Sequence, residues 1–109
     1  MKVYLDNAAT TKLDNEVFEA MLPYLKEEFG NPSSIHAFGR RTRSAIETSR
    51  KTVAKLLGVT PSEIFFTSGG TEADNMAIIQ TLATHNIKHA ISSKIEHHAV
   101  EHTLQVLEK

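Results

Sequence analysis

Apolar residues recur at steps of three and four along much of the chain, the spacing of one face of an α-helix. The first such stretch follows Asp14, a suitable N-cap, and contains Pro23, which should kink the helix. The second runs from about 35 to 57 and ends at Gly58, a typical terminator. The face of this second helix that we expect to be buried comprises Phe38, Ala45, Ile46, Val53, Leu56 and Leu57.

The same spacing predicts two further helices, over about 71–83 and 97–109. The last one should bury the face that carries Val100, Leu104 and Leu107. A single capped turn is expected at Thr60–Glu63, because Pro61 suits the first helical position.

Three short apolar runs predict strands, at 3–5, 64–67 and 89–92. The later strands alternate with helices over short connections, which is typical of a parallel sheet covered by helices. We therefore expect the α/β class. The final helix has no terminating residue after Leu107, so we expect the chain to be one part of a larger domain.

The run Thr67-Ser68-Gly69-Gly70-Thr71 joins an expected strand directly to a helix. Glycines allow a sharp turn with bare amides, and the first amides of a helix lack intrahelical partners and carry partial positive charge. Together with the Thr71 hydroxyl they would form a phosphate site. The alternative is an empty turn with Thr71 as the N-cap. Beside a phosphate, Glu72 and Asp74 would have to point away.

His97 follows the last expected strand, and ligands of open parallel sheets lie beyond the carboxyl ends of strands. Its imidazole could stack on a flat aromatic ligand whose phosphate the glycine turn holds. The alternative is a helix-start residue hydrogen-bonded to the backbone. His98 and His102 could share a helix face, but no third ligand is evident, so we expect no metal site.

Composition narrows the function classes. The chain has 109 residues, 40% of them hydrophobic, and a net charge of −1, which suits one small globular domain and gives no electrostatic reason to expect nucleic acid or a membrane as partner. The basic stretch from Arg40 to Lys55 includes Glu47 and is expected to be a solvated helix face. No cysteine, secretory signal or membrane-spanning run is present, so a cytoplasmic protein is expected.

Four segments in order resemble the cysteine desulfurases of the class-V aminotransferase family. They are Tyr4–Thr11, Gly30–His36, Thr67–Asn75 and Glu96–Val100. The resemblance implies the fold-type-I large domain of pyridoxal-phosphate (PLP) enzymes, with helices packed on a mostly parallel sheet. Residues 1–109 would form a short N-terminal segment plus the start of that cofactor-binding domain. The first two segments would line the active site or a dimer interface.

The resemblance further implies a homodimer that converts L-cysteine to alanine and an enzyme-bound persulfide, for a sulfur acceptor or an iron–sulfur scaffold protein. Gly70 and Thr71 would hold the phosphate of PLP, and His97 would stack on its ring. The family's cofactor lysine, its acidic partner and its nucleophilic cysteine have no counterpart in these 109 residues, so we expect no catalytic residue here and no activity from this piece alone. A selenocysteine lyase and a non-catalytic, self-associating piece are the alternatives.

Overall fold

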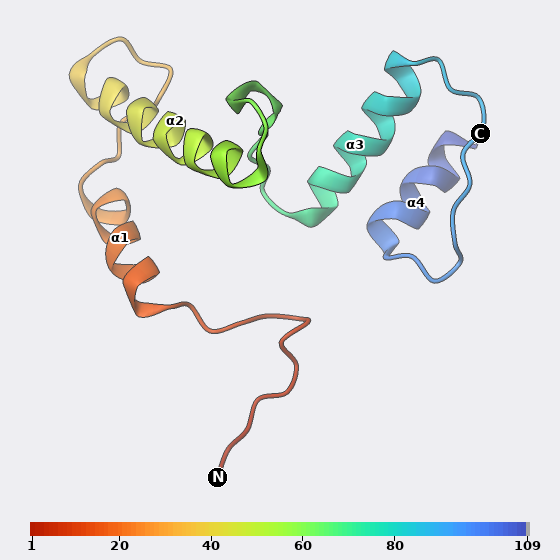
Figure 1. Ribbon diagram of the computed structural model, residues 1–109, viewed down its shortest axis with the longest axis horizontal. Coiled ribbons are helices and arrows are strands. Elements are labelled where there is room, and N and C mark those ends of the chain that lie inside the picture. Colours follow the sequence, from red (N-terminus) through yellow and green to blue (C-terminus); the bar gives the residue numbers. More distant parts are fainter. Residues whose placement is uncertain (109) are drawn as a thin grey trace. The chain divides into compact units, whose positions relative to one another are not determined.

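The computed structural model describes residues 1–108, which divide into two units at Ile64 and Phe65. Each unit has its own helices and internal contacts. The first holds α1 (Asn15–Lys26), α2 (Ala37–Leu57) and the single turn η1 (Pro61–Glu63), and the second holds α3 (Gly70–Thr84) and α4 (His98–Leu107) (Figure 1).

Helix α1 begins where the sequence predicts a cap. The Asp14 carboxylate accepts the backbone N–H of Glu16 at 2.8 Å, so it satisfies one of the free amides of the first turn. Pro23 lies inside the helix, and the N–H of Glu27 donates to the Pro23 carbonyl at 2.8 Å where the helix ends. The predicted N-cap is confirmed.

The loop between α1 and α2 folds back onto the first turn of α2, with two buried glycines at the closest approach. A Cβ on Gly30 would lie 2.4 Å from the carbonyl carbon of Phe38. A Cβ on Gly39 would lie 2.5 Å from the carbonyl oxygen of Asn31. Only glycine fits at either position. The rings of Phe29 and Phe38 stack beside them, with centroids 5.7 Å apart.

Helix α2 ends as predicted at Gly58, whose φ of 69° is left-handed and therefore favours glycine. The capped turn that follows is also confirmed, because the Thr60 N–H donates to the Glu63 carboxylate at 2.8 Å. The Arg50 guanidinium donates to the carbonyl of Ile64, which ties the end of this unit to α2.

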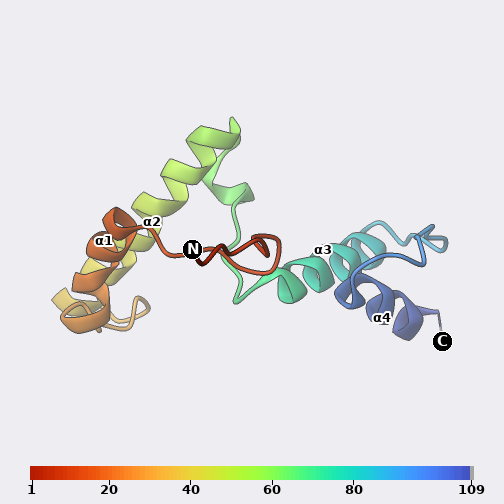
Figure 2. The ribbon, with the colours of Figure 1, turned by 90° about the horizontal axis from the view of Figure 1, so that it is seen from below.

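In the second unit α3 and α4 pack side by side, with their N-termini at the same end of the pair (Figures 1 and 2). The Thr103 hydroxyl of α4 hydrogen-bonds the Asn75 side-chain oxygen of α3. Ala99 is buried, and Val100 and Leu104 are half-buried. The two helices are therefore held in register.

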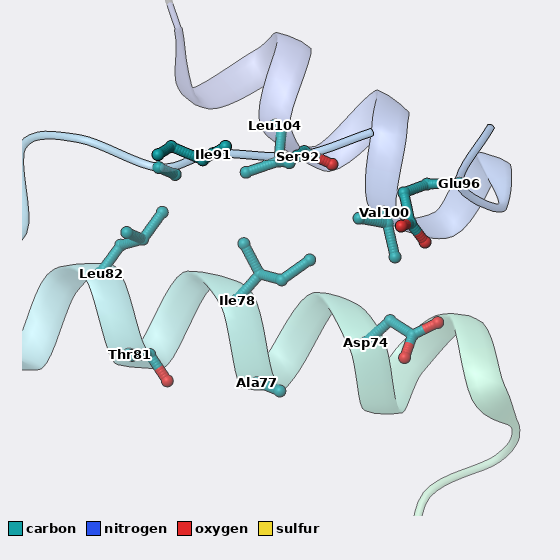
Figure 3. Close-up of a pocket in the computed structure, with 11 residues that line it drawn as sticks. Asp74, Ala77, Ile78, Thr81, Leu82, Ile91, Ser92, Glu96, Val100 and Leu104 are labelled. Carbon is teal, nitrogen blue, oxygen red and sulfur yellow. The ribbon is translucent and has the colours of Figure 1, made fainter. Parts of the chain in front are cut away.

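An open groove of about 520 Å³ lies in this unit, between α3, the segment before α4 and α4 itself. Figure 3 shows Ile78 and Leu82 pointing from α3 toward the segment that carries Ile91. The carboxylates of Asp74 and Glu96 lie at one end of the groove, and its middle is apolar.

The three predicted strands are not present in residues 1–108. The segments at 3–5, 64–67 and 89–92 form no β-ladder with one another or with another described segment. Ile64 keeps an extended backbone, with φ −98° and ψ 122°, so the local conformation suits a strand. A strand is stable only when a neighbour pairs its N–H and C=O groups, and residues 1–108 supply no such neighbour. The described residues are helical, so the expected packing of helices on a sheet is not confirmed in this part of the chain.

The apolar core is correspondingly small. Among the described residues, the buried apolar side chains are those of Ala54 and Ala99. On the predicted buried face of α2, Phe38, Leu56 and Leu57 are exposed, Leu56 by 81%. A helix face is buried only where a facing layer covers it, and these side chains stay exposed although Phe29 stacks on Phe38. No helix in the described part is both long and apolar enough to cross a membrane.

Candidate functional site

The turn before α3 leaves open space at the start of the helix. Gly69 is the N-cap, with an extended backbone (φ 169°, ψ 178°), so the alternative in which Thr71 caps the helix is wrong. A Cβ added at Gly69 or Gly70 would meet no atom within 4 Å. The first N–H groups of α3 have no intrahelical acceptor, so they face a space that a ligand could enter.

Thr71 adds a hydroxyl to these amides. Its side chain is exposed, and the hydroxyl makes no hydrogen bond to another residue in the described part of the chain. Unpaired amides and a free hydroxyl at the positive end of a helix dipole are the chemistry that binds phosphate. An anion that entered this turn would not have to break a contact of Thr71.

The sequence suggested that Glu72 would point away from the turn if a phosphate lay there. In the structure its side chain instead folds back onto the turn. Its carboxylate accepts the backbone N–H of Ser68 at 2.6 Å and the Ser68 hydroxyl at 2.7 Å. The backbone hydrogen bond, and then the hydroxyl, lower the pKa of Glu72 below its ordinary value of 4.5. The Ser68 amide is thus occupied by the chain's own anion, which leaves the amides of Gly70 and Thr71 for a ligand.

His97 is the N-cap of α4. Its Nδ1 accepts the N–H of Ala99 at 3.1 Å, so the neutral ring carries its proton on Nε2. This is the backbone-bonded alternative that the sequence left open. The residue is nevertheless exposed, which leaves its ring accessible to a flat partner. The capping bond fixes the ring and does not consume its stacking surface.

The two predicted pieces of the site belong to one unit. Helices α3 and α4 start at the same end of the pair (Figure 2). The glycine turn, which caps α3, and His97, which caps α4, therefore both lie at that end. No hydrogen bond or ring contact between described residues joins Thr71 to His97. Asp74 and Glu96 bring two carboxylates to the same end of the groove (Figure 3), so an anion bound there would have negative charge nearby.

The other two predicted segments lie in the first unit. The turn after Asp6 is closed by the N–H of Ala9, which donates to the Asp6 carbonyl at 3.1 Å. His36 caps α2, its Nδ1 accepting the Gly39 N–H at 3.4 Å. These hydrogen bonds explain the local backbone conformation of both segments. They do not assign a chemical role to either segment.

The structure also groups residues that the sequence had not. Glu101 lies beside His98 and His102 on α4 and supplies the third ligand-bearing side chain that seemed missing. The signal was present in the spacing, because positions i, i+3 and i+4 share a helix face. Sequence spacing alone places Glu101 on the helix face of both histidines.

Comparison with known proteins gives a consistent result. The family model for class-V aminotransferases matches residues 3–109. A cysteine desulfurase IscS from Dictyoglomus turgidum is 58% identical over 99% of this chain, and one from Methanosarcina thermophila is 55% identical over 97%. A solved NifS-like protein superposes with a TM-score of 0.88 at 43% identity, over 99% of this chain.

These relatives are much longer. The chain spans 28% of the Dictyoglomus protein, 27% of the Methanosarcina protein and 30% of the NifS-like chain. The match nevertheless runs through both units, including the glycine turn before α3 and the start of α4. The chain therefore belongs to the class-V aminotransferase family.

Proposed function

We propose that this chain is the N-terminal part of a PLP-dependent cysteine desulfurase. The complete protein would remove sulfur from L-cysteine and leave alanine and an enzyme-bound persulfide. The observation that carries the proposal is the open Gly69-Gly70-Thr71 turn at the same end of the helix pair as His97. The names of the relatives, at 55–58% identity over nearly the whole chain, support the choice of reaction.

The same proposal includes the fold that the complete protein would adopt. Residues 1–109 would form a short N-terminal segment and the start of a fold-type-I large domain. There the segments at 64–67 and 89–92 would gain strand neighbours and join a mostly parallel sheet. The extended backbone at Ile64 supports this, because it already suits a strand. We further propose a cytoplasmic homodimer that passes sulfur to an acceptor or scaffold protein.

The residues of the turn fit the phosphate of PLP on chemical grounds. Gly70 leaves its amide uncovered, and Thr71 offers a second amide and an unpaired hydroxyl. His97 offers an exposed ring whose orientation is fixed by its capping bond to Ala99. Three hydrogen-bond donors in one turn, with an exposed imidazole at the same end of the helix pair, support the binding of a phosphorylated aromatic ring.

When bound, PLP supplies an electron sink for bond cleavage next to the amino group of a substrate. Gly70 and Thr71 would anchor and orient the cofactor through its phosphate. His97 would cover the pyridine ring and exclude water from that face. No residue described here is assigned a bond-breaking role, so the piece alone is expected to bind and not to turn over.

The test of the site is a PLP titration of the 109-residue chain, followed by absorbance and with inorganic phosphate as competitor. We expect saturable binding that phosphate displaces. Thr71→Val should weaken it by about 1–3 kcal/mol, roughly 5- to 150-fold, because one donor to a dianion is lost. Thr84→Val makes the same change at the far end of α3, is exposed, and should bind like the wild type.

Pyridoxal without the phosphate is the second control. Reaction of its aldehyde with surface lysines would be insensitive to phosphate and to Thr71→Val, so it separates adventitious binding from the site. Equal affinities of Thr71→Val and Thr84→Val, measured also in the complete protein, would overturn the phosphate assignment.

The substrate assignment needs the complete protein. We expect alanine to form from L-cysteine together with a protein-bound persulfide detectable by thiol-specific labelling. Alanine from selenocysteine, with none from cysteine, would instead support the selenocysteine lyase alternative. This assay is independent of the PLP titration, so the site and the reaction can fail separately.

A further inference from the structure

Three side chains that can bind a metal lie together on one face of α4, apart from the glycine turn. His98 Nδ1 is 3.6 Å from Glu101 Oε2, and the rings of His98 and His102 stack with centroids 5.1 Å apart. One ligand atom from each of the three residues falls within 4.8 Å of the others. The spacing i, i+3, i+4 explains why a single helix brings them together.

The carboxylate of this cluster is already oriented. Gln105, one turn further along α4, donates from Nε2 to Glu101 Oε1 at 3.1 Å. That bond leaves Oε2 facing His98. Outer hydrogen bonds that orient a ligating group are typical of metal sites in proteins. His97 does not join the cluster, because its Nδ1 caps the helix.

We propose that His98, Glu101 and His102 bind a divalent zinc ion on the surface of α4. Two imidazoles and a carboxylate are a ligand set that Zn²⁺ accepts, with water completing a tetrahedral shell. Zinc–ligand bonds of about 2.0–2.2 Å put tetrahedral ligand atoms about 3.3 Å apart, so the cluster must contract. The two histidines are exposed and can rotate to do so, and the ion can enter from solvent.

Calorimetric titration of the chain with zinc chloride at fixed pH tests the site. We expect one zinc per chain, and His98→Gln or His102→Gln should each weaken binding by more than about tenfold, the lower bound for losing even an outer-shell partner. The matched control is the double variant His85→Gln/His89→Gln, which removes two exposed histidines outside the cluster and should bind zinc like the wild type.

Two further readouts keep the test decisive if a variant folds poorly. In the wild-type chain, zinc should shift the ring NMR signals of His98 and His102 and leave those of His85 and His89 unchanged. Helical circular dichroism should rise on zinc addition, because one ion clamps adjacent turns of α4. Equal loss of affinity in the control, or shifts spread over all histidines, would mean adventitious binding and overturn the proposal.

Discussion

At the scale of single residues, the candidate site depends on which hydrogen-bonding groups are already used. Glu72 occupies the Ser68 amide, and His97 accepts the amide of Ala99. The Thr71 hydroxyl and the Gly70 amide stay open. The chain thus fixes the geometry of both helix starts with its own side chains and leaves the donors of the candidate phosphate site unpaired, as the proposed preorganised anion site would require.

The hydrogen bonds to Glu72 make the start of α3 sensitive to pH. The folded-state pKa of Glu72 lies below 4.5, so its stabilisation is complete above that value and is lost as the pH falls through the lowered pKa. Glu72→Gln should therefore reduce helicity at neutral pH, and the difference from wild type should vanish in acid. Circular dichroism of both chains across a pH series measures this.

The control for that experiment is Glu16→Gln. Glu16 also lies in the first turn of a helix, but its carboxylate accepts no hydrogen bond from the residues that the structure describes. It shares the interaction with the helix dipole and lacks the bonds to a serine. Equal pH-dependent losses in the two variants would show that the Ser68 contacts add nothing.

At the scale of elements, the helices follow local signals and the strands do not. The helix ends are set by residues that bond to neighbours only a few positions away, namely Asp14, Gly58 and the capped turn Thr60–Glu63. Predicting these ends therefore needs no knowledge of the rest of the molecule. A parallel strand takes its hydrogen bonds from a distant segment, and the described chain does not contain one. The sequence likewise predicted that the glycine turn and His97 lie at helix starts. It did not predict the contact of Glu72 with Ser68, because the direction of a side chain depends on which amides are free.

The left-handed end of α2 gives an element-scale prediction. Gly58→Ala should lower the free energy of unfolding by about 1 kcal/mol, because a residue with a Cβ is strained at a φ of 69°. Gly58→Asn should cost less, because asparagine tolerates this region, as Asn86 does here at a φ of 50°. Thermal melts of the three chains by circular dichroism compare them, and an alanine variant as stable as wild type would contradict the assignment.

At the scale of the whole molecule, the main feature is the large amount of apolar side-chain surface that is exposed to solvent. The described residues bury two alanines and leave large side chains such as Phe65, Leu56 and Ile95 exposed, the last by 93%. Surfaces of this kind mark interaction faces in natural proteins. In the proposed complete enzyme the remaining domain and a second subunit would cover them.

The 109-residue chain should therefore self-associate. Sedimentation equilibrium should give a mean mass that rises with concentration above the 12.1 kDa of a single chain. Leu56→Gln/Leu57→Gln should reduce that rise by removing exposed apolar area, and Lys51→Gln/Lys55→Gln on the same helix should not. A constant mass of 12.1 kDa over a wide concentration range would contradict the prediction.

The mutual approach of the loop after α1 and the first turn of α2 has a consequence for evolution. Because neither Gly30 nor Gly39 tolerates a Cβ, a change at one cannot be rescued by shrinking the other, which is already the smallest residue. An insertion or deletion among the eight residues between them would also move one glycine away from the place where the loop meets α2. This stretch should therefore tolerate neither insertion nor deletion, so the spacing of the two glycines should be the same in distant relatives.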